Sequence, residues 1–213
     1  MRYFWGLIAA LFVTSAATAG DFIVTEEDSS SISVWYIGEV FRHDATKWLD
    51  IREQANGRLI ILTIDSYGGS AYGGFDLYWE IEKDRVVTIA GKWQGAWSAA
   101  AIMWMAGDER IVPEHSAVGW HRAFCNWDPD PCPEIGCEVR ECDMEMLLIF
   151  MDAGYSPIFS DWLIAIQWRN GTDGWIEVHG DSSWWITDNN EDSRIPMHPD
   201  RLGVPEADWT VNL

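Results

Sequence analysis

The sequence predicts a single α/β domain of stacked β-α-β units around a mostly parallel sheet. Apolar runs without alternation, such as residues 58–65 and 85–91, are typical of strands buried on both faces of a parallel sheet. Between them lie segments whose apolar residues recur at helical spacing. A chain of 213 residues is long enough to bury a real core within one domain.

The elements alternate along the chain. The first strand is expected at 32–40, followed by a helix at 44–55 with Asp44 as its N-cap. Then come a strand at 58–65, a helix at 74–84, a strand at 85–91 and a helix at 98–107. Two short strands, two helices and a hairpin complete the domain, at 109–113, 116–121, 138–152, 157–168 and 175–187. From there to the C-terminus we expect irregular chain.

The first 19 residues have the features of a secretory signal. A charged Arg2, an apolar run over 3–13 and small residues at 17–19 follow one another. The apolar run is shorter than the roughly 20 residues that span a bilayer. We therefore expect a signal peptide at 1–19, a single domain at 20–213, no membrane span after cleavage, and a periplasmic or secreted protein.

The chain is strongly acidic, with 34 acidic against 14 basic residues and a net charge of −20. Such a surface repels phosphate backbones and anionic lipids, so we expect no nucleic-acid partner. The 15 tryptophans line a core or a groove by default. A surface that stacks on sugar or peptide is the alternative.

Four cysteines define an insert at about 124–142, namely Cys125, Cys132, Cys137 and Cys142. An even, local set in an exported chain predicts two disulfides, with the connectivity left open. Zinc is the rival interpretation, but the spacing contains no C-x-x-C knuckle, so we expect no metal. Cys125 stands four residues after His121, and we expect the insert to form either a lid over a groove or a staple at the sheet edge.

A glycine-rich stretch follows the buried strand at 58–65. Gly68, Gly69 and Gly73 fit neither the dinucleotide fingerprint nor the P-loop, and no lysine follows, so we expect no cofactor. Two interpretations remain. The glycines form a tight turn and nothing more, or they offer backbone N–H groups to a ligand or a developing oxyanion.

Two further residues carry potential chemistry. Ser98 follows the strand at 85–91 and opens a helix, where it is either an N-cap or a nucleophile. His121 stands at the end of the short strand at 116–121, where a lone histidine is usually structural.

In order and spacing, these segments resemble the proteolytic subunit of the Clp protease and its relatives in the ClpP/crotonase-like superfamily, especially the exported relatives. The resemblance covers roughly residues 32–122. It implies a ClpP/crotonase-type fold with Ser98 as nucleophile and His121 as general base. The backbone N–H groups of Gly69 and Ala99 would form the oxyanion hole.

The resemblance also implies that a later aspartate completes a catalytic triad with Ser98 and His121. Asp181 is favoured over Asp173 for this role. Two departures from the family are Tyr67, where it usually has proline, and Asp65, where it has asparagine. Nothing in the sequence suggests docking to an unfolding ATPase. A homo-oligomer is compatible with the resemblance.

Two functions follow from these expectations. The first is an exported serine hydrolase, a peptidase that acts on short or unstructured peptides by a Ser-His(-Asp) mechanism. The alternative is a non-catalytic protein of the same fold that binds peptide or glycan through a tryptophan-lined groove.

Overall fold

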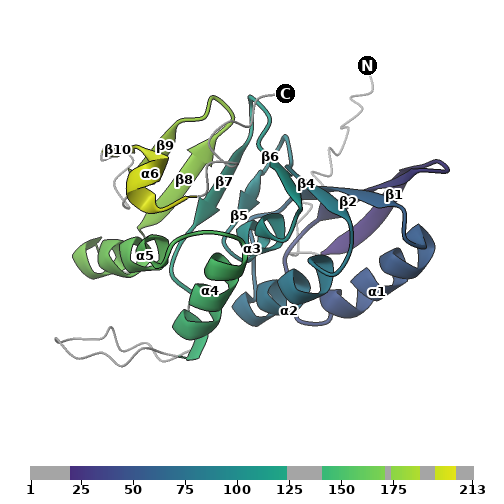
Figure 1. Ribbon diagram of the computed structural model, residues 1–213, viewed down its shortest axis with the longest axis horizontal. Helices are drawn as coiled ribbons and strands as arrows, with labels where there is room; N and C mark the ends of the chain where they lie inside the picture. The colour runs from purple at the N-terminus through teal and green to yellow at the C-terminus, as the bar shows by residue number, and fades with distance from the viewer. Residues whose placement is uncertain (1–19, 124–140, 171–173, 188–194, 205–213) are drawn as a thin grey trace, which may run out of the picture.

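The computed structural model describes residues 20–123, 141–170, 174–187 and 195–204 (Figure 1). The expected signal peptide, most of the cysteine insert and Asp173 lie outside this part of the chain. Both the signal peptide and the domain boundary after it stay predictions. Within the described residues, no helix combines the length and apolar character needed to cross a bilayer.

The first of two sheets holds the N-terminal half. Its strand order is β1-β2-β3-β4-β6, and only the β1–β2 pair is antiparallel. The strands are β1 (Asp21–Glu27), β2 (Ser31–Ile37), β3 (Leu59–Asp65), β4 (Val86–Ala90) and β6 (Glu109–Ile111). The crossover helices α1 (Asp44–Ala55) and α2 (Ala71–Ile81) lie side by side along this sheet (Figure 1). The predicted β-α-β units and the parallel sheet are confirmed here.

The second sheet has the order β10-β9-β8-β7-β5 and is mainly antiparallel. Only β5 (Ala96–Trp97) and β7 (Ala117–Trp120) pair in parallel. The predicted hairpin is β8 (Trp175–His179) and β9 (Trp184–Thr187), and β10 (Ile195–Met197) extends it. The remaining helices are α3 (Ala99–Met105), α4 (Glu141–Asp152), α5 (Pro157–Asn170) and α6 (Pro199–Leu202).

Helix α3 forms the centre of the core. All seven of its residues are buried, and the helix contacts strands of both sheets. Its small side chains allow this close packing, since alanine occupies its first three positions. Three fully buried indoles, those of Trp48, Trp104 and Trp120, show that several tryptophans belong to the core.

The expectation that Asp44 caps α1 is wrong. The N-cap is His43, and Asp44 is the first helical residue, with its side chain buried. Its Oδ2 accepts hydrogen bonds from the Tyr36 hydroxyl at 2.8 Å and from the Phe41 N–H at 2.7 Å. The carboxylate therefore joins the end of β2 to the start of α1 instead of satisfying the helix terminus.

Candidate active site

Ser98 occupies a strained turn between β5 and α3. Its backbone has φ 56° and ψ −122°, a region that non-glycine residues rarely adopt. Although Ser98 is the N-cap of α3, its side chain makes no capping hydrogen bond. Its Oγ lies instead 2.6 Å from Nε2 of His121. The structure therefore does not support the interpretation in which the Ser98 side chain caps the helix.

Backbone hydrogen bonds hold the strained turn on both sides. The N–H of Ser98 donates to the Gly119 carbonyl at 2.8 Å, which ties the turn to β7. The N–H of Trp97 donates to the Ser66 carbonyl at 3.0 Å, which ties β5 to the end of β3. The Oγ is thus presented from a backbone that both sheets restrain.

His121 directly follows β7, which pairs in parallel with β5. The register places Trp97 beside Gly119, so Ser98 and His121 leave neighbouring strands on the same side. The ring of Trp175 packs against the imidazole, with 4.4 Å between the ring centroids. Sequence analysis missed Trp175 because its contact depends on the antiparallel β7–β8 pairing.

The glycine stretch is needed for close approach to this turn. A Cβ on Gly68 would lie 2.6 Å from Cβ of Ser98 and 2.6 Å from the Trp97 carbonyl oxygen. A Cβ on Gly74 would lie 2.8 Å from the carbonyl oxygen of Ala99. Gly68 has φ +96°, so its backbone also favours glycine.

Gly69 and Ala99 have backbone N–H groups outside the hydrogen-bond pattern of the sheet and helix. The N–H of Val40 donates to the Gly68 carbonyl and that of Ser70 donates to the Val40 carbonyl, so Gly69 between them turns its own N–H away from Val40. In the described part of the chain, neither the Gly69 N–H nor the Ala99 N–H has a hydrogen-bond acceptor. Such donors can stabilise a developing oxyanion.

Ser98, His121, Gly69 and Ala99 line one small pocket, with a volume of about 80 Å³. The other walls are apolar and come from α2, α3, β7 and α4, with Phe75, Ile102, Trp120 and Met146 among them. The spacing of residues along the sequence does not reveal that these side chains share a pocket, because four separate elements supply them.

Asp181 does not join this site, and its assignment as the third triad member is corrected here. It lies in the turn between β8 and β9. This turn is near the first residue of β7, since Ala117 pairs with His179 at the end of β8. His121 leaves the opposite end of β7, about 13 Å away at the usual rise per strand residue. Asp181 instead accepts the Ser183 N–H at 2.9 Å, and hydrogen bonds from Ser183 lower its pKa.

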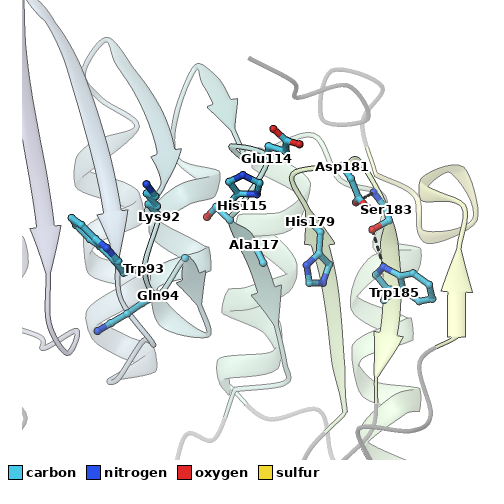
Figure 2. Close-up of a pocket in the computed structure, with 12 residues that line it drawn as sticks. Lys92, Trp93, Gln94, Glu114, His115, Ala117, His179, Asp181, Ser183 and Trp185 are labelled. Atoms are coloured by element: carbon cyan, nitrogen blue, oxygen red, sulfur yellow. Dashed lines mark hydrogen bonds between the residues drawn. The ribbon is translucent and has the colours of Figure 1, made fainter.

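Figure 2 shows where Asp181 lies: on the rim of a separate open pocket, near His179 and across from His115. This pocket is formed by the β4–β5 loop, the β6–β7 loop and the β8–β9 hairpin. The other carboxylate considered from the sequence, Asp173, lies outside the described residues.

Cys142 is the one predicted disulfide cysteine within the described residues. It is buried at the start of α4 and is disulfide-bonded. Cys125, Cys132 and Cys137 fall outside the described residues, so the predicted set of two disulfides stays a prediction. Among the described side chains, no cluster of three histidine, cysteine, aspartate or glutamate residues could hold a metal ion.

Solved structures similar to this chain include two proteases. One is a mutant of ClpP1 from Listeria monocytogenes, at 19% identity and a TM-score of 0.49, covering 70% of this chain and 83% of that one. The other is a mutant of a membrane-bound stomatin-specific protease, at 13% identity and a TM-score of 0.46, covering 63% of this chain and 67% of that one.

Crotonase-fold proteins are also found among the similar structures. An enoyl-CoA hydratase from Mycobacterium marinum has 14% identity and a TM-score of 0.34, covering 47% of this chain and 53% of that one. No protein-family model and no curated protein matches the sequence. The solved structures named here are thus two proteases and an enoyl-CoA hydratase.

Proposed function

We propose that the protein is a serine hydrolase, and more narrowly a peptidase. The observation that carries the proposal is the 2.6 Å contact between Ser98 Oγ and His121 Nε2. A serine at a strained turn, with a histidine within hydrogen-bond reach, is the arrangement of an activated nucleophile and its base. In support of it, Gly69 and Ala99 line the same pocket, and neither backbone N–H has an acceptor among the described residues.

The reaction follows from these positions. Ser98 Oγ attacks the substrate carbonyl while Nε2 of His121 takes the hydroxyl proton. The N–H groups of Gly69 and Ala99 stabilise the oxyanion of the tetrahedral intermediate. The imidazolium of His121 then gives its proton to the leaving amine, which departs and leaves an acyl-enzyme on Ser98. His121 next takes a proton from water, which attacks the ester carbonyl, and returns that proton to Ser98 Oγ as the acid product leaves.

The pocket indicates which peptide bonds are cleaved. Because its walls are apolar and its volume is only about 80 Å³, it suits one apolar side chain next to the scissile bond. Substrates are short or unstructured peptides, since Ser98 Oγ must reach the backbone carbonyl next to that side chain, which a folded chain usually keeps in its own hydrogen bonds. We also propose that the protein acts outside the cytoplasm, on the basis of its signal-like N-terminus.

A fluorophosphonate probe tests this function directly, since it reacts only with an activated serine. We expect folded wild-type protein to be labelled, Ser98→Ala to be unlabelled, and His121→Ala to be labelled about 10²–10⁴-fold more slowly. His115→Ala is the matched control, because His115 is exposed and belongs to the other pocket. Unlabelled wild-type protein would contradict the hydrolase and leave the binding function.

A further inference from the structure

His121 stands just beyond the part of β7 that the sheet restrains. The paired register of β7 and β8 ends with Trp120 opposite Ile176. A Ser98–His121 contact of 2.6 Å nevertheless requires a well-defined backbone at residue 121. The position of His121 therefore depends on the Trp175 ring packed against its imidazole and on what holds the residues that follow it.

The next residue, Arg122, is held by a buried ion pair. Its Nε donates to Asp143 Oδ1 at 2.7 Å and its Nη2 donates to Asp143 Oδ2 at 2.5 Å. The two side chains are only 8% and 3% exposed. Two parallel hydrogen bonds fix the guanidinium plane as well as its distance from the carboxylate.

Helix α4, which carries Asp143, is itself anchored on α2. The indole N–H of Trp79 donates to Glu145 Oε1 at 2.7 Å, and the Tyr78 hydroxyl donates to Asp152 Oδ2 at 2.7 Å. Figure 1 shows α4 beside α2, and the two helices are in contact. The ion pair thus ties the segment after β7 to a helix that is fixed independently.

Burying an arginine and an aspartate is costly, and apolar residues of similar size often give equal or greater stability. What the bidentate pair adds is a defined orientation. We infer that Arg122 and Asp143 are positioning residues, whose ion pair keeps the His121 imidazole at hydrogen-bonding distance from Ser98. The inference rests on the proposed function for its catalytic consequence, whereas the hydrogen bond can be observed without activity.

Nitrogen NMR of the histidine rings measures that hydrogen bond. The His121 signal is assigned by its loss in His121→Ala. We expect Asp143→Asn to move the His121 nitrogen resonance to the chemical shift of an imidazole that has no hydrogen bond with the serine hydroxyl. Asp84→Asn is the matched control, since it weakens the Arg52–Asp84 ion pair of 2.8 Å between α1 and the turn after α2. An unchanged His121 signal in Asp143→Asn overturns the inference.

A double variant separates positioning from simple charge burial. Removing one partner leaves an unpaired buried charge and can unfold the protein, but Arg122→Met with Asp143→Leu removes both charges. We expect this variant to melt close to the wild type and still to lose the His121 signal. A double variant with the wild-type signal would mean that the pair only satisfies two buried charges.

Labelling kinetics distinguish the two proposals. A displacement of the base by about 1 Å lowers the rate about 100-fold, so both variants should label that much more slowly. For a chromogenic peptide, kcat should fall while KM stays unchanged. Wild-type protein that is unlabelled, but whose His121 signal depends on Asp143, contradicts only the proposed function. Variants labelled at the wild-type rate contradict only the positioning role.

Discussion

Replacing Gly68 by alanine should slow the proposed reaction of Ser98 although neither Ser98 nor His121 is itself replaced. The added Cβ would lie 2.6 Å from Cβ of Ser98 and 2.6 Å from the Trp97 carbonyl oxygen. Ordinary contacts between carbon atoms are about 3.5–4.0 Å, so the Ser98 turn must move by about 1 Å. The Trp97 carbonyl oxygen belongs to the backbone and Cβ of Ser98 is attached to it, so a rotamer change cannot relieve either contact.

The magnitude has two parts. A displacement of about 1 Å corresponds to a loss of about 100-fold in the labelling rate. Alanine at positive φ costs about 1 kcal/mol of folding free energy, and overpacking adds about 1–3 kcal/mol. Gly68→Ala should therefore lower the free energy of unfolding by about 2–4 kcal/mol.

Gly57→Ala supplies the matched control. Gly57 has φ +80°, close in kind to the +96° of Gly68, but a Cβ there would have no neighbour within 4 Å. We expect this variant to lose about 1 kcal/mol, or about 3 °C in Tm, and to label like the wild type. The assay is the second-order rate constant of fluorophosphonate labelling, measured with Tm on the same samples. The reasoning is refuted if Gly68→Ala labels as fast as Gly57→Ala.

Three further predictions concern other parts of the chain. Asp181→Asn should leave labelling within about twofold of the wild type, whereas a triad aspartate would cost about 10⁴-fold; the same assay on Asp173→Asn tests the other carboxylate. Asp44→Ala should lower the free energy of unfolding by about 2 kcal/mol, because the Phe41 N–H loses its acceptor and the Tyr36 hydroxyl keeps only its longer hydrogen bond to the Glu39 carbonyl at 3.2 Å; urea unfolding with an unchanged midpoint would contradict this. Intact-mass measurement should find four hydrogens fewer than in the reduced protein if all four cysteines pair, and free thiols or bound zinc would refute that pairing.

Local sequence patterns predicted the elements in which the spacing of apolar residues shows which side chains are buried. The helix over 44–55 follows directly from its apolar spacing, and α1 has those bounds. The edge strand β1 escaped prediction because most of its side chains are exposed or half-buried, so that its sequence carries little periodic signal. Strand β5 has two residues and exists only through its pairing with Ser66 and β7.

Candidate site residues were predictable only where a backbone feature marked them. Gly68, Gly69 and Ser98 stand at junctions between a strand and a helix, which the sequence displays. Trp175 and Met146 reach the site through strand register and helix packing. The choice of Asp181 failed for the same reason, since the register of an antiparallel hairpin decides which end of β7 its turn approaches.

The parallel pairing of β5 with β7 would make the proposed reactivity of Ser98 a reporter of folding. Residues 96–98 and 118–121 are separated in the chain by α3 and β6, so the pairing is a non-local contact that closes a long loop. Helices and hairpins form locally and early, whereas such contacts come later. A labelling pulse applied at successive times during refolding will thus register when the second sheet reaches its native pairing, independently of how much secondary structure has already formed.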